Sequence, residues 1–196
     1  MKYLKQLFTG IEVAPILAEL DAHPEVWDVR RLRKATYVHG DVSDVWIRFN
    51  AWENYDPEGG EAALKKFVLE PHDAVWYPES DCLPSLKTLI FELMCTLRAE
   101  RLGTVLITKI PPGKQVHPHI DPGWAARFYE KVAVQLRSAP EQSFCFDDGR
   151  YVCEAGTIYS FDNSQTHWVD NDSAVDRITA IICIKRDVRA KMLAHD

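Results

Sequence analysis

The second half of this chain consists of short apolar segments separated by turn residues, and this pattern restricts the possible fold more than any other feature. From Gly103 onward the segments are TVLITKI, KVAVQLRS, SFCFDD, YVCEA, GTIYSFD, THWVDN and RITAIICIK. The turn signals are Pro-Pro-Gly at 111–113, Asp-Asp-Gly at 147–149 and Asp-Asn-Asp at 170–172. Seven or eight short strands in succession predict an antiparallel barrel or jelly roll.

The first half of the chain has helical periodicity instead. The spacing of its apolar residues predicts a short helix over residues 14–23 and a longer one over residues 84–101, whereas residues 45–49 alternate like a strand. The last strand, residues 177–185, is apolar on both faces, so we expect the barrel interior on one side and a helix on the other. We therefore predict an α+β chain, mostly β with a helical N-terminal half. Its core is a double-stranded β-helix of the jelly-roll, cupin-like type, buttressed by helices.

Length and composition fit one soluble domain. We expect a single domain over residues 1–196, with a helical or mixed support region over 1–102 and the jelly-roll core over 103–185. A net charge of −6 argues against general nucleic-acid binding. The five cysteines are odd in number and lack a CxxC spacing, which disfavours a disulfide framework and a structural zinc site.

Neither a signal peptide nor a membrane span is expected. The N-terminal residues lack a long apolar run with a cleavage site, and the longest apolar stretches are too short to cross a bilayer. We expect a cytoplasmic protein. The densest basic run, Arg30–Lys34, is predicted to be a solvated turn or strand end, with contact to an acidic substrate as the alternative.

The stretch VHPHIDPGW, residues 116–124, places His117, His119 and Asp121 at alternate positions. On a strand, alternate side chains share one face, so three potential metal ligands point the same way. His167, which begins a later predicted strand, is the best candidate for a ligand from elsewhere. Two imidazoles and a carboxylate make the facial triad of non-haem Fe(II) oxygenases. The alternative is a polar loop that binds no metal.

Arg177 follows His167 by ten residues and begins the last, apolar strand. An arginine at such a place must be paired, because an isolated buried charge is strongly unfavourable. Its natural partner is a carboxylate held by two parallel hydrogen bonds, with the hydroxyl of Thr179 on the same face as a second donor. A dicarboxylic co-substrate could provide that carboxylate. The alternative is a structural salt bridge to one of the 29 acidic residues.

The order of these residues resembles the Fe(II)/2-oxoglutarate-dependent oxygenases, and within them the aspartyl/asparaginyl β-hydroxylase and proline hydroxylase branch. The resemblance covers residues 103–185 and is carried by TKIPPGKQVHPHID and GTIYSFDNSQTHWVDNDSAVDRITAIICI. It implies that His119, Asp121 and His167 ligate Fe(II), that Arg177 anchors 2-oxoglutarate, and that O₂ is the oxidant. It also implies that Thr108, eleven positions before the first ligand, helps hold the co-substrate; a core threonine is the alternative.

The chain departs from the family pattern at two positions. Some β-hydroxylases of this branch lack the acidic ligand, so the presence of Asp121 is closer to the proline-hydroxylase pattern. Many relatives carry a histidine where this chain has Ala133. We expect Lys131 or Arg127 to take over whatever that histidine does for the substrate or co-substrate.

Further residues near the motif are candidates for substrate contact. His117 is predicted to lie beside the site or at the pocket rim instead of ligating the metal. Trp124 and Arg127 follow the metal loop and could roof the substrate pocket, with packing of the loop against the barrel as the alternative. Four other histidines are expected at the surface: His23, His39, His72 and His195.

These observations together predict a hydroxylase acting on an amino acid, either free or within a peptide or protein. One alternative is a metal-dependent enzyme of the same barrel type that does not use 2-oxoglutarate, such as an isomerase or hydrolase. Another is a binding module that has lost catalysis. The sequence does not indicate an oligomeric state.

Overall fold

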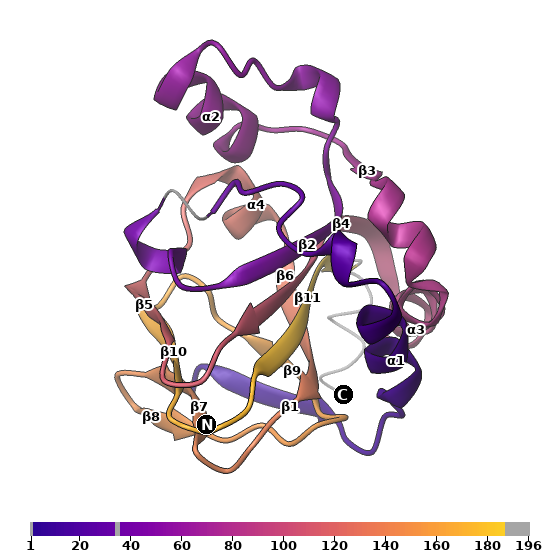
Figure 1. Cartoon of the computed structure of the whole chain (residues 1–196), viewed down its shortest axis with the longest axis vertical. Helices are drawn as coiled ribbons and strands as arrows, with labels where there is room; N and C mark the ends of the chain where they lie inside the picture. Colours follow the sequence, from indigo (N-terminus) through magenta and orange to yellow (C-terminus); the bar gives the residue numbers. More distant parts are fainter. Residues whose placement is uncertain (1, 34–35, 187–196) are drawn as a thin grey trace.

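Two antiparallel sheets face each other across the molecule in the computed structural model, which describes residues 2–33 and 36–186 (Figure 1). The larger sheet has seven strands in the order β1 (Leu4–Phe8), β9 (Ile158–Phe161), β6 (Glu130–Arg137), β11 (Arg177–Arg186), β4 (Ala99–Ile110), β2 (Ser43–Asn50) and β3 (Ala74–Trp76). The smaller sheet has four, in the order β5 (Gln115–His119), β10 (His167–Asn171), β7 (Gln142–Phe146) and β8 (Gly149–Tyr151).

The predicted jelly roll is confirmed by this arrangement. A core of buried residues joins the inner faces of the two sheets, with Ile110, Ala133 and Tyr159 from the larger sheet and Phe144 and Val169 from the smaller. Strands adjacent in each sheet are mostly distant in sequence, as when β11 lies between β4 and β6. This pairing of distant strands across two facing layers is what distinguishes a jelly roll from a simple meander.

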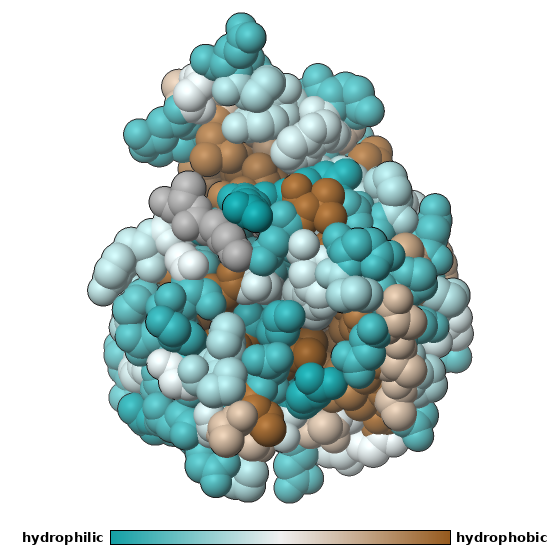
Figure 2. Space-filling view, viewed as in Figure 1, coloured by the Kyte–Doolittle hydropathy of each residue, from teal (hydrophilic) through white to brown (hydrophobic). Residues whose placement is uncertain are grey.

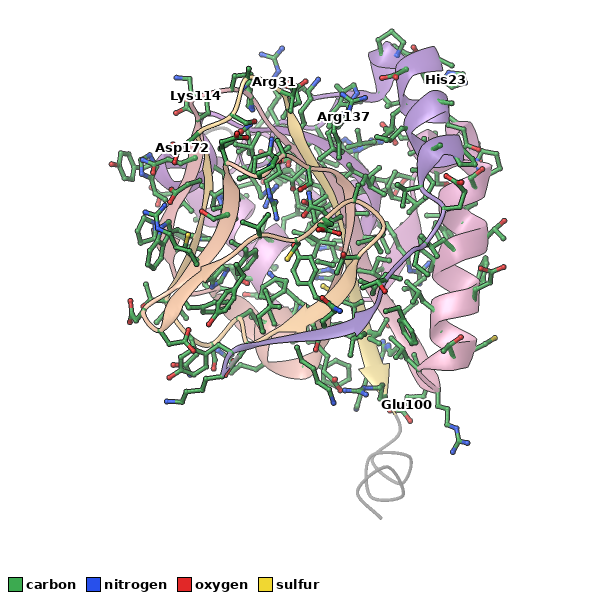
Figure 3. All side chains as sticks on the ribbon, turned by 90° about the horizontal axis from the view of Figure 1, so that it is seen from below. His23, Arg31, Glu100, Lys114, Arg137 and Asp172 are labelled. Atoms are coloured by element: carbon green, nitrogen blue, oxygen red, sulfur yellow. The ribbon has the colours of Figure 1, made fainter. Side chains whose placement is uncertain are left out.

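The helices α1 (Ala14–Ala22) and α3 (Pro84–Thr96) cover the outer face of the larger sheet, as Figure 3 shows from below. Leu86, Ile90 and Leu93 on α3 pack into one core with the strands. The outward-facing residues of β11 join that core, whereas Arg177 and Thr179 line the cavity between the sheets. The prediction that this strand is covered on both sides is therefore confirmed.

A third cluster lies under α2 (Gly60–Leu69), which projects from the body of the molecule (Figure 1). Phe67 of this helix packs against Phe49 of β2 and Leu106 of β4. The space-filling view in Figure 2 shows apolar side chains gathered where this lobe meets the rest of the protein. The short helix α4 (Gly123–Phe128) lies below it and follows the metal-ligand motif directly.

Four local predictions are corrected by the structure. The second helix begins at Pro84 as expected but ends at Thr96 instead of continuing through residue 101, because Arg98 has a positive φ of 51°. A φ of 51° lies in the left-handed region, which a continuing helix does not use, so the chain turns at Arg98 and enters β4 at Ala99.

The other three corrections concern strands and turns. The segment YVCEA is a strand only at its first residue, because β8 is a short edge strand that ends at Tyr151. The Asp-Asn-Asp signal lies mostly within β10, which extends to Asn171, so the turn follows it. The strands β1 and β3 were not predicted, and they bring parts of the first hundred residues into the larger sheet.

Gly156 occupies a position that only glycine fits. Its φ is +79°, and an added Cβ would lie 2.5 Å from the carbonyl oxygen of Ile11. Its own amide donates to Gln135 and its carbonyl accepts from Ile11, so the backbone cannot easily move away. These contacts tie the segment between β1 and α1 to the end of β6.

We expect Gly156→Ala to lower the free energy of unfolding by about 2–3 kcal/mol, measured by urea denaturation. Gly113→Ala is the matched control, because Gly113 also has a positive φ of +68° but an added Cβ there meets nothing within 4 Å. The control should lose only the conformational part, about 1 kcal/mol. Equal losses in the two variants would contradict the close approach to Ile11.

Candidate active site

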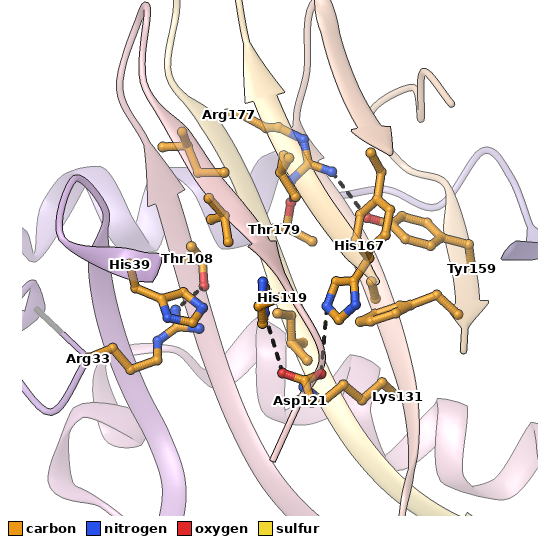
Figure 4. A pocket seen from close by; sticks show the side chains of 17 residues that line it. Arg33, His39, Thr108, His119, Asp121, Lys131, Tyr159, His167, Arg177 and Thr179 are labelled. Atoms are coloured by element: carbon orange, nitrogen blue, oxygen red, sulfur yellow. Dashed lines mark hydrogen bonds and ion pairs between the residues drawn. The ribbon is translucent and has the colours of Figure 1, made fainter. Parts of the chain in front are cut away.

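A cavity of about 60 Å³ lies between the two sheets and contains the predicted metal and co-substrate residues in its wall. Figure 4 shows Asp121 toward one end and Arg177 toward the other, with His119 and His167 between them. The strands supply these residues from both layers, since β5 and β10 belong to the smaller sheet and β11 to the larger.

The structure brings His119, Asp121 and His167 together. His119 ends β5 and is paired in register with His167 at the start of β10, while Asp121 lies just beyond β5. The Nε2 atoms of His119 and His167 lie 3.5 and 3.7 Å from the two carboxylate oxygens of Asp121. One potential ligand atom from each residue lies within 4.8 Å of the others. These distances suit three ligands around one metal ion.

Hydrogen bonds orient both imidazoles toward the carboxylate. The Nδ1 of His119 donates to the carbonyl of His117 over 2.8 Å, and the Nδ1 of His167 donates to the carbonyl of Gln165 over 2.9 Å. Since a backbone carbonyl occupies Nδ1 in each ring, Nε2 is the nitrogen that faces Asp121. A carbonyl on the far nitrogen is how proteins fix a metal-binding histidine.

The charge states also suit metal binding. Burial lowers the pKa of His167 to about 4, so its imidazole is neutral at neutral pH. For Asp121, burial alone would raise the pKa, but Lys131, His119 and His167 outweigh it and hold the pKa well below its usual value. The site therefore offers a neutral nitrogen from His167 and a carboxylate from Asp121, and with the imidazole of His119 these residue types are the donor set of a facial triad.

His117 does not join this group. The pairing of β5 with β10 shifts between His119 and Val116, so three steps on β5 match two on β10. This bulge, in a segment that contains Pro118, breaks the strict alternation. His117 stacks instead on Tyr37, with ring centroids 4.3 Å apart, and is not part of the cavity wall.

Arg177 is buried among neutral partners. Its side chain donates to Thr179 Oγ1 over 2.7 Å, to Gln135 Oε1 over 2.8 Å and to Tyr159 Oη over 3.2 Å, and the residue is only 5% exposed. Within residues 2–33 and 36–186, no carboxylate forms a salt bridge with it. The alternative of a structural salt bridge therefore has no support among the described residues.

Thr108 lies in the cavity wall opposite Thr179 on the neighbouring strand. Its hydroxyl is already engaged, since it accepts from Arg33 over 2.8 Å and lies 3.3 Å from Asp44 Oδ1. Arg33 and Asp44 also form an ion pair with each other. A role for Thr108 toward the co-substrate stays a prediction, and in this structure it belongs to a network that fixes Arg33.

Two residues placed elsewhere by the sequence prediction lie in this cavity. Arg33 belongs to the basic run expected to be solvated, yet it lines the wall, and Arg30 pairs with Glu79. His39, expected at the surface, lies with its ring centroid 5.1 Å from that of His119. Burial, with the nearby charge of Arg33, lowers the pKa of His39 to about 2, so this ring is neutral.

The residues of α4 lie outside the cavity wall. Trp124 packs against His72 and Tyr129, and Arg127 is exposed. Trp124 therefore packs against the rest of the protein in this structure, as the alternative interpretation expected, and does not roof the cavity. His72 is half-buried between aromatic rings, which contradicts the expected surface position, whereas the side chain of His23 is 41% exposed. His195 lies outside the described residues.

Lys131 and Ala133 both line the cavity from β6. The Lys131 ammonium forms an ion pair with Asp121 Oδ2, so it contacts a candidate metal ligand directly. Ala133, where the sequence resemblance implied a histidine, adds no polar group to the wall. Lys131 is thus the basic residue of this strand that reaches the metal end.

The sequence reasoning missed Gln135 and Tyr159, which hold Arg177 from two other strands. The sequence contains a feature that could have identified each of these two residues. Gln135 is a polar residue inside the apolar segment KVAVQL and is completely buried, and Tyr159 is a completely buried tyrosine in TIYSF. A polar group in such a strand needs a partner within the core.

No helix among the described residues is long and apolar enough to cross a membrane. No curated protein sequence matches the chain significantly. Solved structures show the same fold at low identity. A 2OG-Fe(II) oxygenase family oxidoreductase from Burkholderia pseudomallei is 20% identical, with a TM-score of 0.52, over 87% of this chain and 78% of that one.

Two hydroxylase structures are also similar. The viral collagen prolyl hydroxylase of Paramecium Bursaria Chlorella virus-1, solved with 2OG, has a TM-score of 0.55 and 10% identity over 94% of this chain and 96% of that one. A Pseudomonas putida prolyl-4-hydroxylase has a TM-score of 0.51 and 14% identity over 94% and 92%. At these identities the likeness shows the fold alone.

The family is identified by a match to the amino-acid sequence. The profile described as Aspartyl/Asparaginyl beta-hydroxylase matches residues 19–187, which includes most of the chain and every residue of the cavity described above. With the jelly roll and the His-Asp-His cluster in place, this protein belongs to the aspartyl/asparaginyl β-hydroxylase family.

Proposed function

We propose that this protein is an Fe(II)- and 2-oxoglutarate-dependent dioxygenase that hydroxylates an amino acid, either free or within a peptide or protein. The observation that carries the proposal is one cavity with two features. At one end, His119, Asp121 and His167 turn three ligand atoms toward one point; at the other, Arg177 is buried without a carboxylate partner among the described residues.

The three ligand residues would hold Fe(II). They offer two imidazole nitrogens and a carboxylate oxygen, and a facial set of this kind leaves other coordination positions for O₂ and a chelating co-substrate. When bound, iron and 2-oxoglutarate supply the oxidising chemistry, in which one oxygen atom enters the substrate and the other enters succinate as CO₂ is released. The protein orients the reactants and excludes water.

Arg177 would bind the distal carboxylate of 2-oxoglutarate. Its guanidinium is held rigidly by Thr179, Gln135 and Tyr159, so little conformational freedom is lost when an anion binds. A carboxylate also provides the negative charge that the neutral partners lack. Because the residue is buried, such a charge-assisted pair is stronger than it would be at the surface.

The walls between the two ends are largely apolar. Ile110, Val116 and Phe144 line the cavity together with Phe161. These side chains would keep water from the reacting centre and leave the polar contacts to its two ends. This division fits an elongated dicarboxylate better than a small neutral ligand.

The two alternative functions remain distinct. A metal-dependent enzyme without 2-oxoglutarate would use the triad but has no need of Arg177 in the same cavity. A binding module would need neither the three ligand residues nor Arg177. Substrate contacts are proposed at Lys131 and, outside the cavity wall, at His117, Trp124 and Arg127. The prolyl hydroxylase names of two similar structures support an amino-acid residue as the substrate.

The test is an anaerobic titration of the Fe(II)-loaded protein with 2-oxoglutarate. We expect the weak visible absorption band of the chelate to appear, and to be absent when iron is omitted. Its appearance would justify a screen of amino acids and peptides for stimulated succinate release. If iron binds but no band forms, the metal-dependent enzyme without 2-oxoglutarate becomes the better reading.

A further inference from the structure

Lys131 stands between two cavities. On one side it lines the metal cavity, where its ammonium pairs with Asp121 Oδ2, the oxygen that also lies 3.7 Å from His167 Nε2. Its side chain is 20% exposed and lies 5.9 Å from the ring centroid of Phe161. Figure 4 shows Lys131 reaching the carboxylate from the side away from Arg177.

A larger cavity of about 310 Å³ adjoins the first. It is lined by residues 2–5, 129–131 and 160–163, and it shares Lys131 and Phe161 with the metal cavity. Its wall includes the acidic residues Glu130 and Asp162. Lys131 lines both cavities, so the larger and partly acidic one offers its ammonium a second position.

The position beside Asp121 conflicts with a metal ion. A divalent cation bound by the triad would lie against the same carboxylate as the ammonium, and the two positive charges would repel each other. Without the metal, however, the ammonium compensates the buried carboxylate, whose charge would otherwise be unpaired. The same lysine thus stabilises the metal-free site and opposes the metal.

We propose that Lys131 is a positioning residue that holds Asp121 while the site is free of metal and turns toward the neighbouring cavity when the metal binds. The inference rests on the metal-binding part of the proposed function. It goes beyond that function because it assigns to a non-ligand residue the control of metal affinity.

The first test measures Mn²⁺ affinity by electron paramagnetic resonance. We expect Lys131→Met to bind Mn²⁺ at least tenfold more tightly than the wild type, because no ammonium must be displaced. Lys131→Arg keeps the charge and should restore wild-type affinity. Lys5→Met is the matched control, since Lys5 lines the larger cavity but has no contact with Asp121. Its affinity should not change.

The second test uses the wild-type protein and does not depend on a variant folding. Reductive methylation of lysines, followed by mass spectrometry, should label Lys131 faster with Mn²⁺ than without it, because the ammonium leaves the ion pair for the open cavity. His119→Ala should remove the difference. Lys5 provides an internal reference.

The outcomes separate the two ideas. If the wild type binds no Mn²⁺, the proposed function fails. If it binds Mn²⁺ but Lys131→Met binds no more tightly, or labelling of Lys131 is unchanged or slower with metal, only the inference about Lys131 is overturned.

Discussion

His167→Ala should abolish tight metal binding. The residue supplies one of three ligand atoms, and its Nε2 faces Asp121 because its Nδ1 donates to Gln165. Loss of a partner that only supports a ligand costs roughly 10–100-fold in metal affinity, so loss of the ligand itself should cost more. Titration with Fe(II) under anaerobic conditions, or with Mn²⁺ in air, measures the change.

The matched control is His117→Ala. His117 lies two residues before His119, but its side chain stacks on Tyr37 and no ligand atom comes from it. The hydrogen bond that orients His119 goes to its backbone carbonyl, which the substitution keeps. Metal affinity should therefore be unchanged. A loss at His117 as large as the loss at His167 would show that the ligand set is wrong.

His167 is almost fully buried, so the substitution also leaves a small void. Urea denaturation of the metal-free protein reports that structural cost separately. If the variant unfolds, His167→Gln keeps most of the volume and allows the same metal titration. Retained affinity in a folded variant would contradict the assignment.

The sequence predicted those parts of the fold that depend on local periodicity. The apolar face of α3 repeats at Leu86, Ile90 and Leu93, and β11 alternates between the helices and the cavity. Each pattern can be recognised within one segment, because the surface against which the segment packs need only be apolar. His119, His167 and Arg177 could be predicted as candidates for the same reason, since each lies at the end or start of a strand, and Asp121 follows β5 directly.

What the sequence could not predict depends on contacts between distant segments. Arg33 reaches the cavity only because Asp44 and Thr108, on two neighbouring strands, hold it there. Its basic neighbours made a solvated turn the simpler reading. His39 likewise lies near His119 because the fold brings the two segments together, and no pattern in the sequence relates them. Short edge strands such as β3, with three residues, carry too little pattern to be recognised.

The end of α3 shows a different limit. The helical spacing continues through Leu97, and no glycine or proline marks the stop. Arg98 nevertheless adopts a positive φ, which costs about 1 kcal/mol or more in a non-glycine residue. The pairing of β4 with β11 and β2 offsets that cost, and this pairing is a property of the whole sheet. Local propensity is overridden here by tertiary structure.

Arg177→Met should leave metal affinity unchanged and weaken 2-oxoglutarate binding by about 10²–10³-fold. Truncating one partner of a buried, hydrogen-bonded charge pair costs about 2–5 kcal/mol, and a loss in the middle of that range corresponds to this factor. The measurement is the anaerobic 2-oxoglutarate titration of the Fe(II) protein. Tyr159→Phe is the control, because it removes one hydroxyl that contacts Arg177 and keeps the guanidinium. It should weaken binding by about tenfold or less.

The stability of Arg177→Met separates a functional arginine from a structural one. Removing a buried charge that lacks an ionic partner also removes its desolvation penalty, whereas breaking a buried ion pair costs about 3–5 kcal/mol. Within the described chain, Arg177 contacts only neutral oxygens. We therefore expect the variant to unfold at the same urea concentration as the wild type, or a higher one, when no 2-oxoglutarate is present. Added 2-oxoglutarate should stabilise the iron-loaded wild type and not the variant. Strong destabilisation with unchanged co-substrate affinity would mean that Arg177 supports the fold and that the co-substrate is held elsewhere.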